Sequence, residues 1–260
     1  MIRRILSSVV LIPPLLLLLL FGSSDWFFAL LLPVSAILLY EWHAMVQGSS
    51  RIQFLYSVIA SWLLLAAKFF GLAVPLELLL LLFLMLLLVL SMPRYPEEGR
   101  TIQRIGYHVT GVIYCIVPLI LLLDLHHYWG GKAVLFLLLV IWATDSGALV
   151  FGKWLGQRRF AARISPGKTV TGFWGGLAMG VVAAMLAATW MSLPWQWGHA
   201  AVLGLVISFF GQMGDLAESM LKREAGVKDS GRLIPGHGGM LDRLDSLLFA
   251  APVFFIMIRY

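Results

Sequence analysis

Long apolar runs separated by short polar segments make up most of the chain. A first run at Ile5–Phe21 is followed by runs at roughly Trp26–Val46, Ile52–Phe70, Val74–Met92, Ile105–Leu123, Ala133–Phe151, Phe173–Leu193, Ala200–Leu221 and Asp245–Ile258. Most are near the ~20 residues that a helix needs to cross a bilayer, and the last is short. The pattern predicts an all-α, polytopic integral membrane protein with about nine transmembrane helices, forming a single membrane domain over residues 1–260.

The composition agrees with a membrane protein. Hydrophobic residues make up 60% of the chain and charged residues 12%, with a mean hydropathy of +0.91, which is far more apolar than a soluble domain. The net charge of +6 is scattered between apolar runs, so we expect membrane lipid headgroups and no nucleic acid as partners. The single cysteine, Cys115, excludes disulfides within the chain and cysteine-rich metal sites.

The N-terminus resembles a signal peptide, because Met1-Ile-Arg-Arg precedes the first apolar run. No small-residue cleavage site follows, so a retained first helix is expected. Pro13 and Pro14 should kink this helix or delay its start.

The basic residues predict an orientation. If the N-terminus is cytoplasmic, sixteen of the 19 Lys and Arg residues fall in cytoplasmic segments. The positive-inside rule therefore favours an N-in, C-out arrangement in the cytoplasmic (inner) membrane. It places the basic loops Gly152–Thr171 and Lys222–Arg243 on the cytoplasmic side, where nucleotides are found.

Polar residues gather in the second half. Residues 1–130 are expected to be mainly lipid-facing helices, and 131–260 to be the catalytic half, with the densest polar segment at 215–246. There, residues 235–239 (Pro-Gly-His-Gly-Gly) predict a turn that opens onto a helix start. Such a start offers unpaired N–H groups to an anion. Asp242 and Asp245 share a face of the following helix and offer oxygens to a cation such as Mg2+.

Two acids within the apolar runs need an explanation, because an acid costs free energy inside a bilayer. Asp145 is either a metal or substrate ligand or a partner in a helix-to-helix contact. Asp215 shares a helix face with Ser219 and is expected to bind metal. Glu218 has a structural alternative, an ion pair with Lys222 four residues later.

Two further residues keep alternatives open. Lys168 follows Gly167, but position 162 is Ala and no strand is expected before the loop, so this is no phosphate loop. Lys168 either contacts phosphate or serves positive-inside topology. His237 is assigned to phosphate or nucleotide contact, with a structural role as the alternative. The remaining histidines are interpreted as interfacial: His43, His108, His126, His127 and His199.

The residues from Ser219 to Asp245 resemble a known signature. Ser219-x-x-Lys222-Arg223, Lys228-Asp229, Pro235-Gly-His-Gly-Gly and Asp242-Arg243-x-Asp245 are similar to the phosphatidate cytidylyltransferase (CDP-diacylglycerol synthase) family, without a departure from its pattern. The resemblance implies a nucleotidyltransferase of phospholipid biosynthesis. It would transfer cytidylyl from CTP to phosphatidic acid, forming CDP-diacylglycerol and pyrophosphate, with Mg2+ and with a second cation left open.

The resemblance and the residue chemistry together suggest roles. The expected catalytic residues are Asp215, Lys222, Arg223, Asp242 and Arg243. The expected substrate-binding residues are Lys168, Ser219, Lys228, Asp229, Gly236, His237, Gly238 and Gly239. The expected metal ligands are Asp215, Asp242, Asp245 and Asp145.

Two other functions stay open at this point. Acids and glycine-broken helices inside a membrane also build the ion paths of transporters, although the charges here gather at one side. A related CTP-using or kinase-type enzyme acting on polyprenol or another lipid would show similar chemistry. The sequence leaves homo-oligomer formation open.

Overall fold

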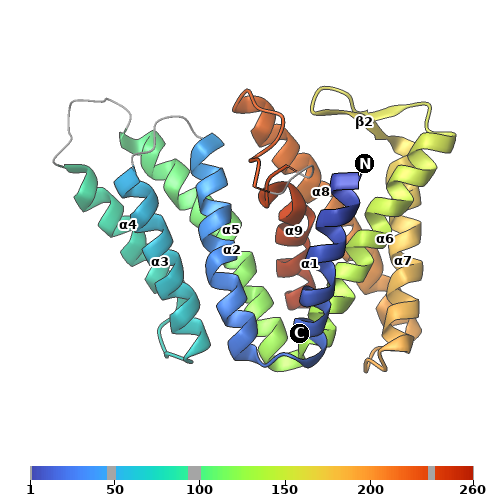
Figure 1. The fold of residues 1–260 in the computed structure, drawn as a ribbon, viewed down its shortest axis with the longest axis horizontal. Coiled ribbons are helices and arrows are strands. Elements are labelled where there is room, and N and C mark those ends of the chain that lie inside the picture. Colours follow the sequence, from blue (N-terminus) through green and yellow to red (C-terminus); the bar gives the residue numbers. More distant parts are fainter. Residues whose placement is uncertain (1, 46–50, 93–100, 234–237, 260) are drawn as a thin grey trace.

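The computed structural model arranges its helices in an alternating up-and-down bundle (Figure 1). It describes residues 2–45, 51–92, 101–233 and 238–259, with no side chains described for residues 2–11. Within these ranges the helices are α1 Ile2–Phe21, α2 Ser24–Met45, α3 Arg51–Phe69, α4 Leu76–Ser91, α5 Thr101–Trp129, α6 Gly131–Leu155, α7 Val170–Trp190, α8 Trp197–Glu224 and α9 Leu241–Arg259. Each expected apolar run corresponds to one helix.

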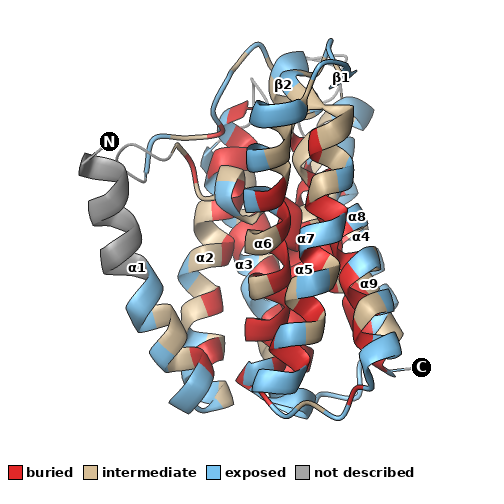
Figure 2. Cartoon of the chain, turned by 90° about the vertical axis from the view of Figure 1, so that its right-hand side faces the viewer, coloured by how far each residue is buried: buried red, intermediate tan, exposed pale blue. Residues whose placement is uncertain are grey.

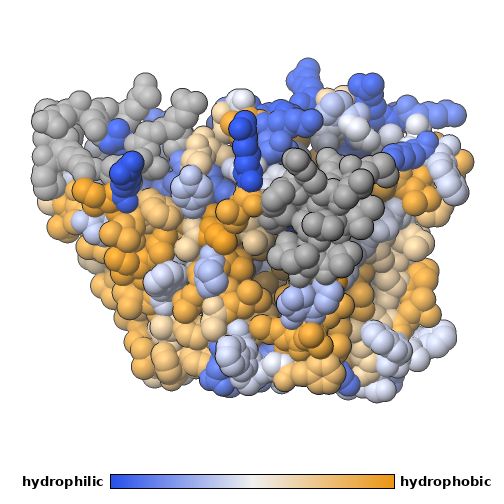
Figure 3. All heavy atoms as spheres, in the orientation of Figure 1, coloured by the Kyte–Doolittle hydropathy of each residue, from blue (hydrophilic) through white to orange (hydrophobic). Residues whose placement is uncertain are grey.

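The bundle carries a hydrophobic band between two polar edges. Figure 3 shows this band across the middle of one face, with hydrophilic residues gathered along the upper edge and fewer along the lower edge. Six helices, α2, α3, α5, α6, α7 and α8, are long and apolar enough to cross a membrane. The apolar part of α1, Ile12–Phe21, and α4 are shorter. The chain is thus an all-α membrane protein, and the crossing count of about nine stays a prediction.

The core lies where α5, α6, α8 and α9 meet (Figure 2). Fully buried side chains there include Phe136 of α6 and Phe254 of α9, whose rings stack at 5.6 Å. Although α5 belongs to the half expected to be mainly lipid-facing, Cys115, Ile116 and other α5 residues are completely buried. Helix α5, before residue 130, therefore packs into the same core as the helices of the second half.

Small residues allow α6 and α7 to pack more extensively than any other pair of helices. A Cβ placed on Gly172 would lie 2.7 Å from the Ala148 carbonyl oxygen, and one on Gly176 would lie 3.0 Å from that of Thr144. These separations leave no room for a side chain. Close backbone approach at small residues is a usual way for membrane helices to associate.

The connection between α6 and α7 is a β-hairpin rather than the strand-free loop expected from the sequence. Strands β1 Arg159–Ala161 and β2 Ser165–Thr169 pair antiparallel. The Phe160 ring stacks on Phe173 of α7 at 4.7 Å, and the Thr169 hydroxyl caps α7 by accepting a hydrogen bond from the Gly172 amide at 3.1 Å. Cap and stacking attach the hairpin to the polar end of α7.

The structure adds detail to two further expectations. His43, His108 and His126 are buried within the bundle, and a ring nitrogen of His43 in α2 lies 2.8 Å from one of His108 in α5; their position at the membrane interface stays a prediction. Their side chains obtain polar partners inside the bundle, which allows burial. The α1 helix begins at Ile2 and continues through Pro13 and Pro14, so the prolines do not delay its start.

Candidate active site

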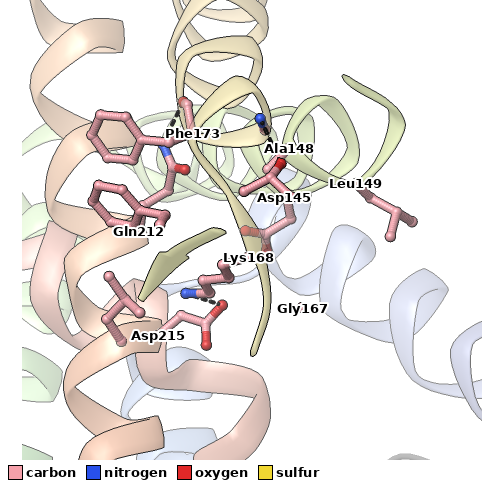
Figure 4. A pocket seen from close by; sticks show the side chains of 12 residues that line it. Asp145, Ala148, Leu149, Gly167, Lys168, Phe173, Gln212 and Asp215 are labelled. Atoms are coloured by element: carbon pink, nitrogen blue, oxygen red, sulfur yellow. Dashed lines mark hydrogen bonds and ion pairs between the residues drawn. The ribbon is translucent and has the colours of Figure 1, made fainter. Parts of the chain in front are cut away.

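A cavity of about 230 Å3 lies at the polar end of the bundle, between α6, the hairpin, α7 and α8. Its polar lining includes Asp145, Lys168 and Asp215, which come from α6, β2 and α8 (Figure 4). Apolar residues such as Phe160 and Phe173 complete the wall. Three of the residues predicted to carry chemistry, separated by up to 70 positions in the sequence, therefore share one cavity.

Lys168 lies between the two carboxylates (Figure 4). Its Nζ forms an ion pair with Asp215 Oδ2 at 2.8 Å, and Asp145 is within electrostatic range of both groups. The Ser219 hydroxyl donates a 3.3 Å hydrogen bond to Asp215 Oδ1, as the shared helix face predicted. The Asp215 side chain remains 38% exposed and is accessible to a ligand, whereas the 26% exposure of the Lys168 side chain excludes its Nζ atom, which is buried against Asp215.

A second polar cluster joins α8 to α9. The Lys222 ammonium lies 2.5 Å from Glu218 Oε2 and 2.6 Å from Asp242 Oδ1. All three side chains are nearly buried. The structural alternative for Glu218 is confirmed, and Asp242 pairs with Lys222. The two clusters are linked because Asp215, Glu218, Ser219 and Lys222 lie along one face of α8.

Asp242 anchors the beginning of α9. Its Oδ2 accepts hydrogen bonds from the Gly239 amide at 2.8 Å and from the Ser230 amide at 3.0 Å, and it lies 3.0 Å from the Ser230 hydroxyl, whose single hydrogen it shares with Glu41. Burial alone would raise the pKa of Asp242, but the hydrogen bonds from Lys222 and from Gly239 outweigh it, and the pKa lies below its ordinary value. Asp242 therefore stays ionised and holds the helix start in place.

The helix start itself has a partner that sequence reasoning missed, Glu41 of α2. The Glu41 carboxylate accepts hydrogen bonds from the Met240 amide at 2.9 Å, the Leu241 amide at 2.8 Å and the Ser230 hydroxyl at 3.0 Å. The expected helix start is confirmed, but these amides do not point at an open anion site. The available signal was an acid near the end of the run Trp26–Val46.

Asp245 lies between the two clusters. It is 8% exposed, its Oδ1 accepts a 2.6 Å hydrogen bond from the Ser246 amide, and it is within electrostatic range of Asp215, Glu218 and Asp145. In the part of the chain that the structure describes, no three His, Cys, Asp or Glu side chains group closely enough to hold a metal by themselves. Mg2+ usually takes only one or two carboxylates and fills its shell with water and phosphate oxygens. Asp145 and Asp215, which face the cavity, fit such a site better than Asp242, whose oxygens already accept hydrogen bonds from Lys222, the Ser230 amide and the Gly239 amide.

The remaining predicted residues surround these clusters. Arg223 is exposed and donates a long 3.5 Å hydrogen bond to the Ile164 carbonyl in the hairpin turn. Arg243 lies within electrostatic range of Asp145. Lys228 and Asp229 are exposed in the loop after α8. Gly238 has a positive φ of 84°, which favours glycine. Gly236 and His237 lie outside the described residues.

Fold and site together define a class: a helical membrane protein with a charged cavity at one polar end. The family model for the "Cytidylyltransferase family" matches residues 2–260. The chain belongs to this family.

Curated relatives named phosphatidate cytidylyltransferase are similar to parts of the chain. One from Bacillus subtilis (strain 168) is 42% identical over 161 residues, which is 61% of this chain and 60% of the relative. One from Brucella suis biovar 1 is 46% identical over 128 residues, 49% of this chain and 47% of the relative. One from Synechocystis sp. is 49% identical over 118 residues, 45% of this chain and 40% of the relative. The matches thus span between two fifths and three fifths of these relatives.

Proposed function

We propose that this protein transfers cytidylyl from CTP to phosphatidic acid, forming CDP-diacylglycerol and pyrophosphate for phospholipid biosynthesis. The cavity that brings Asp145, Lys168 and Asp215 together is the observation that carries the proposal. Family membership and the relatives' names support the same reaction. A cavity of about 230 Å3 is smaller than the ~300–1,000 Å3 of typical ligand pockets, so we assign it to the phosphates and leave the nucleoside outside it.

The reaction needs positioning and charge neutralisation more than proton transfer. An oxygen of the lipid phosphate attacks the α-phosphorus of CTP in line, a new P–O bond forms, and the bond to the bridging oxygen breaks to release pyrophosphate. The attacking oxygen is already anionic, so a strong general base is not required. Lys168 would leave Asp215 to contact a phosphate, while Arg223, beside the hairpin turn, and Arg243, within electrostatic range of Asp145, would add positive charge nearby.

The acids would hold Mg2+, with a second cation left open. Asp145 and Asp215 are the proposed ligands, and Asp245 lies close enough to add negative charge. When bound, the metal would neutralise charge on the triphosphate and on the leaving pyrophosphate. Asp242 is assigned instead to holding Lys222 and the start of α9, because its hydrogen bonds leave it poorly placed to bind metal.

The orientation is part of the proposal. All nine helices of the described residues would cross the inner membrane, with the N-terminus and the cavity on the cytoplasmic side. Supporting this, the start of α1, the hairpin and the ends of α2 and α8 lie at the same polar edge (Figure 1). CTP would enter from the cytoplasm and the lipid sideways from the bilayer.

Labelling of introduced cysteines should report this orientation. Lys228→Cys and Arg159→Cys should react with an impermeant maleimide only from the cytoplasmic side, and Gln196→Cys only from the opposite side. All three positions are exposed, whereas Cys115 is fully buried and should stay unlabelled in the parent protein. Labelling of position 228 from the outer side would contradict both the orientation and the proposed entry of CTP.

The activity itself is tested with purified protein in lipid nanodiscs, labelled CTP and defined lipids. We expect a CDP-diacylglycerol product that requires phosphatidic acid and Mg2+, with pyrophosphate released in equal amount. Polyprenol or diacylglycerol in place of phosphatidic acid should give no product. A product from polyprenol alone would identify a different CTP-using enzyme, and no CTP-dependent lipid product would refute the proposal.

A further inference from the structure

We propose that Glu41 is a positioning residue for the active site, acting from the first half of the chain on the start of α9. The inference rests on the proposed function and adds a residue outside the signature segment. Glu41 lies in α2, 189 positions before its partner Ser230. Its side chain does not line the cavity, and its hydrogen bonds within the described part of the chain come from Ser230, Met240 and Leu241.

Glu41 is built into the structure as an acceptor for backbone amides. The residue is 1% exposed. Its two carboxylate oxygens accept hydrogen bonds from the Met240 amide at 2.9 Å and from the Leu241 amide at 2.8 Å. These amides belong to the first turn of α9, where N–H groups have no acceptor within the helix. A buried carboxylate at a helix N-terminus also interacts favourably with the helix dipole.

Two glycines shape the space that Glu41 occupies. A Cβ on Gly231 would lie 2.5 Å from Glu41 Oε1, and a Cβ on Gly239 would overlap Glu41 Oε2. Neither position has room for a larger residue. Gly231 and Gly239, which flank the residues outside the description, therefore both pack against this one carboxylate of α2.

Ser230 connects Glu41 to the second polar cluster, formed by Glu218, Lys222 and Asp242. The Ser230 hydroxyl lies 3.0 Å from Glu41 Oε2 and 3.0 Å from Asp242 Oδ2, so the two carboxylates are linked by one side chain. Asp242 in turn holds Lys222 at 2.6 Å. Releasing Glu41 should loosen Ser230 and the first turn of α9, and with them the position of Asp242 and Lys222.

The test is Glu41→Gln, which keeps the size of the side chain but places an NH2 group against amides that need an acceptor. We expect CDP-diacylglycerol formation to fall about tenfold to a hundredfold in kcat, with KM for phosphatidic acid changed less than threefold. Glu77→Gln is the matched control, because Glu77 is an exposed acid in the same half of the chain. It should behave as the parent protein.

Two measurements separate positioning from general damage. In a double-mutant cycle, Glu41→Gln combined with Asp242→Asn should be no more than about threefold worse than Asp242→Asn alone, because both act on the same cluster. Trypsin cleavage after Arg232, in the loop that Glu41 holds, should be at least fivefold faster in Glu41→Gln than in the Glu77→Gln control. This second readout does not depend on activity.

The outcomes distinguish the two proposals. Parent-like turnover and cleavage in Glu41→Gln, or fully multiplicative losses in the double mutant, would overturn the positioning role while leaving the proposed reaction intact. If the parent protein makes no CDP-diacylglycerol, the proposed function fails. Faster trypsin cleavage in Glu41→Gln would then still support the anchoring of this loop, and unchanged cleavage would contradict it.

Discussion

Replacing Asp215 with Asn should lower cytidylyl transfer at least ~100-fold while the protein remains as stable as the parent. A metal ligand supplies several kcal/mol of charge stabilisation in the transition state, and each 1.36 kcal/mol is worth tenfold in rate. The Lys168–Asp215 ion pair is partly exposed, and such pairs contribute only ~0–1 kcal/mol to folding. Turnover of CTP and the thermal unfolding midpoint in detergent are the two measurements.

Magnesium titration and a control variant sharpen this test. Raising Mg2+ should recover part of the Asp215→Asn activity if the lost carboxylate is a metal ligand. Glu224→Gln, which removes an exposed acid at the end of the same helix, should keep normal turnover. Near-normal transfer by Asp215→Asn at low Mg2+ would show that Asp215 is no ligand, and the search would move to Asp145 and Asp245.

Asp242→Asn should show the opposite balance, with a clear loss of stability as well as activity. Asp242 accepts hydrogen bonds from Lys222, Ser230 and Gly239, and removing one partner of a buried ion pair costs about 3–5 kcal/mol. We therefore expect a lower unfolding midpoint, at least ~100-fold less turnover, and no recovery with added Mg2+.

Acid provides an independent check on Asp242. Its folded-state pKa is lowered from the ordinary value of 3.8, so its contribution to stability is present above that value and is lost as pH falls through the lower folded-state pKa. The difference in unfolding midpoint between parent and Asp242→Asn should therefore shrink in acid. A fully stable Asp242→Asn protein whose activity returns with Mg2+ would instead make Asp242 a metal ligand.

The helices were predictable because bilayers demand long apolar segments, and each expected run became one helix. The proximity of acidic residues that lie far apart in the sequence was only partly predictable. Helical spacing places Asp215 beside Ser219, but nothing local in the sequence indicates that Asp145 faces Asp215. That proximity depends on close packing of α6 against α7 and on the hairpin that carries Lys168 back over the cavity.

Three other features, strand β1, the contacts of Glu41 and the role of Asp242, could not be predicted from the sequence, for different physical reasons. Strand β1 has only three residues, which is too short to show the alternation of apolar and polar residues that predicts a strand. In the sequence, Glu41 looks like an ordinary acid near the end of a membrane helix. Its carboxylate oxygens accept hydrogen bonds from backbone amides of residues 240 and 241. Because every residue type except proline has such an amide, the sequence gives no sign of this contact. For Asp242, an aspartate in this position of the sequence is compatible both with binding a cation and with capping a helix, so the sequence does not distinguish the two roles.

The glycine contacts between α6 and α7 bear on how this protein can be stabilised for experimental work. Alanine is a better helix former than glycine by roughly 0.5–1 kcal/mol, so Gly→Ala exchange is a common engineering choice. Gly172 and Gly176 have no room for a methyl group, and enlarging either would separate the helices that carry Asp145 and the hairpin. Gly106 and Gly198 are exposed helix positions with no neighbouring atom within 4 Å of an added Cβ, so that exchange carries no steric cost there.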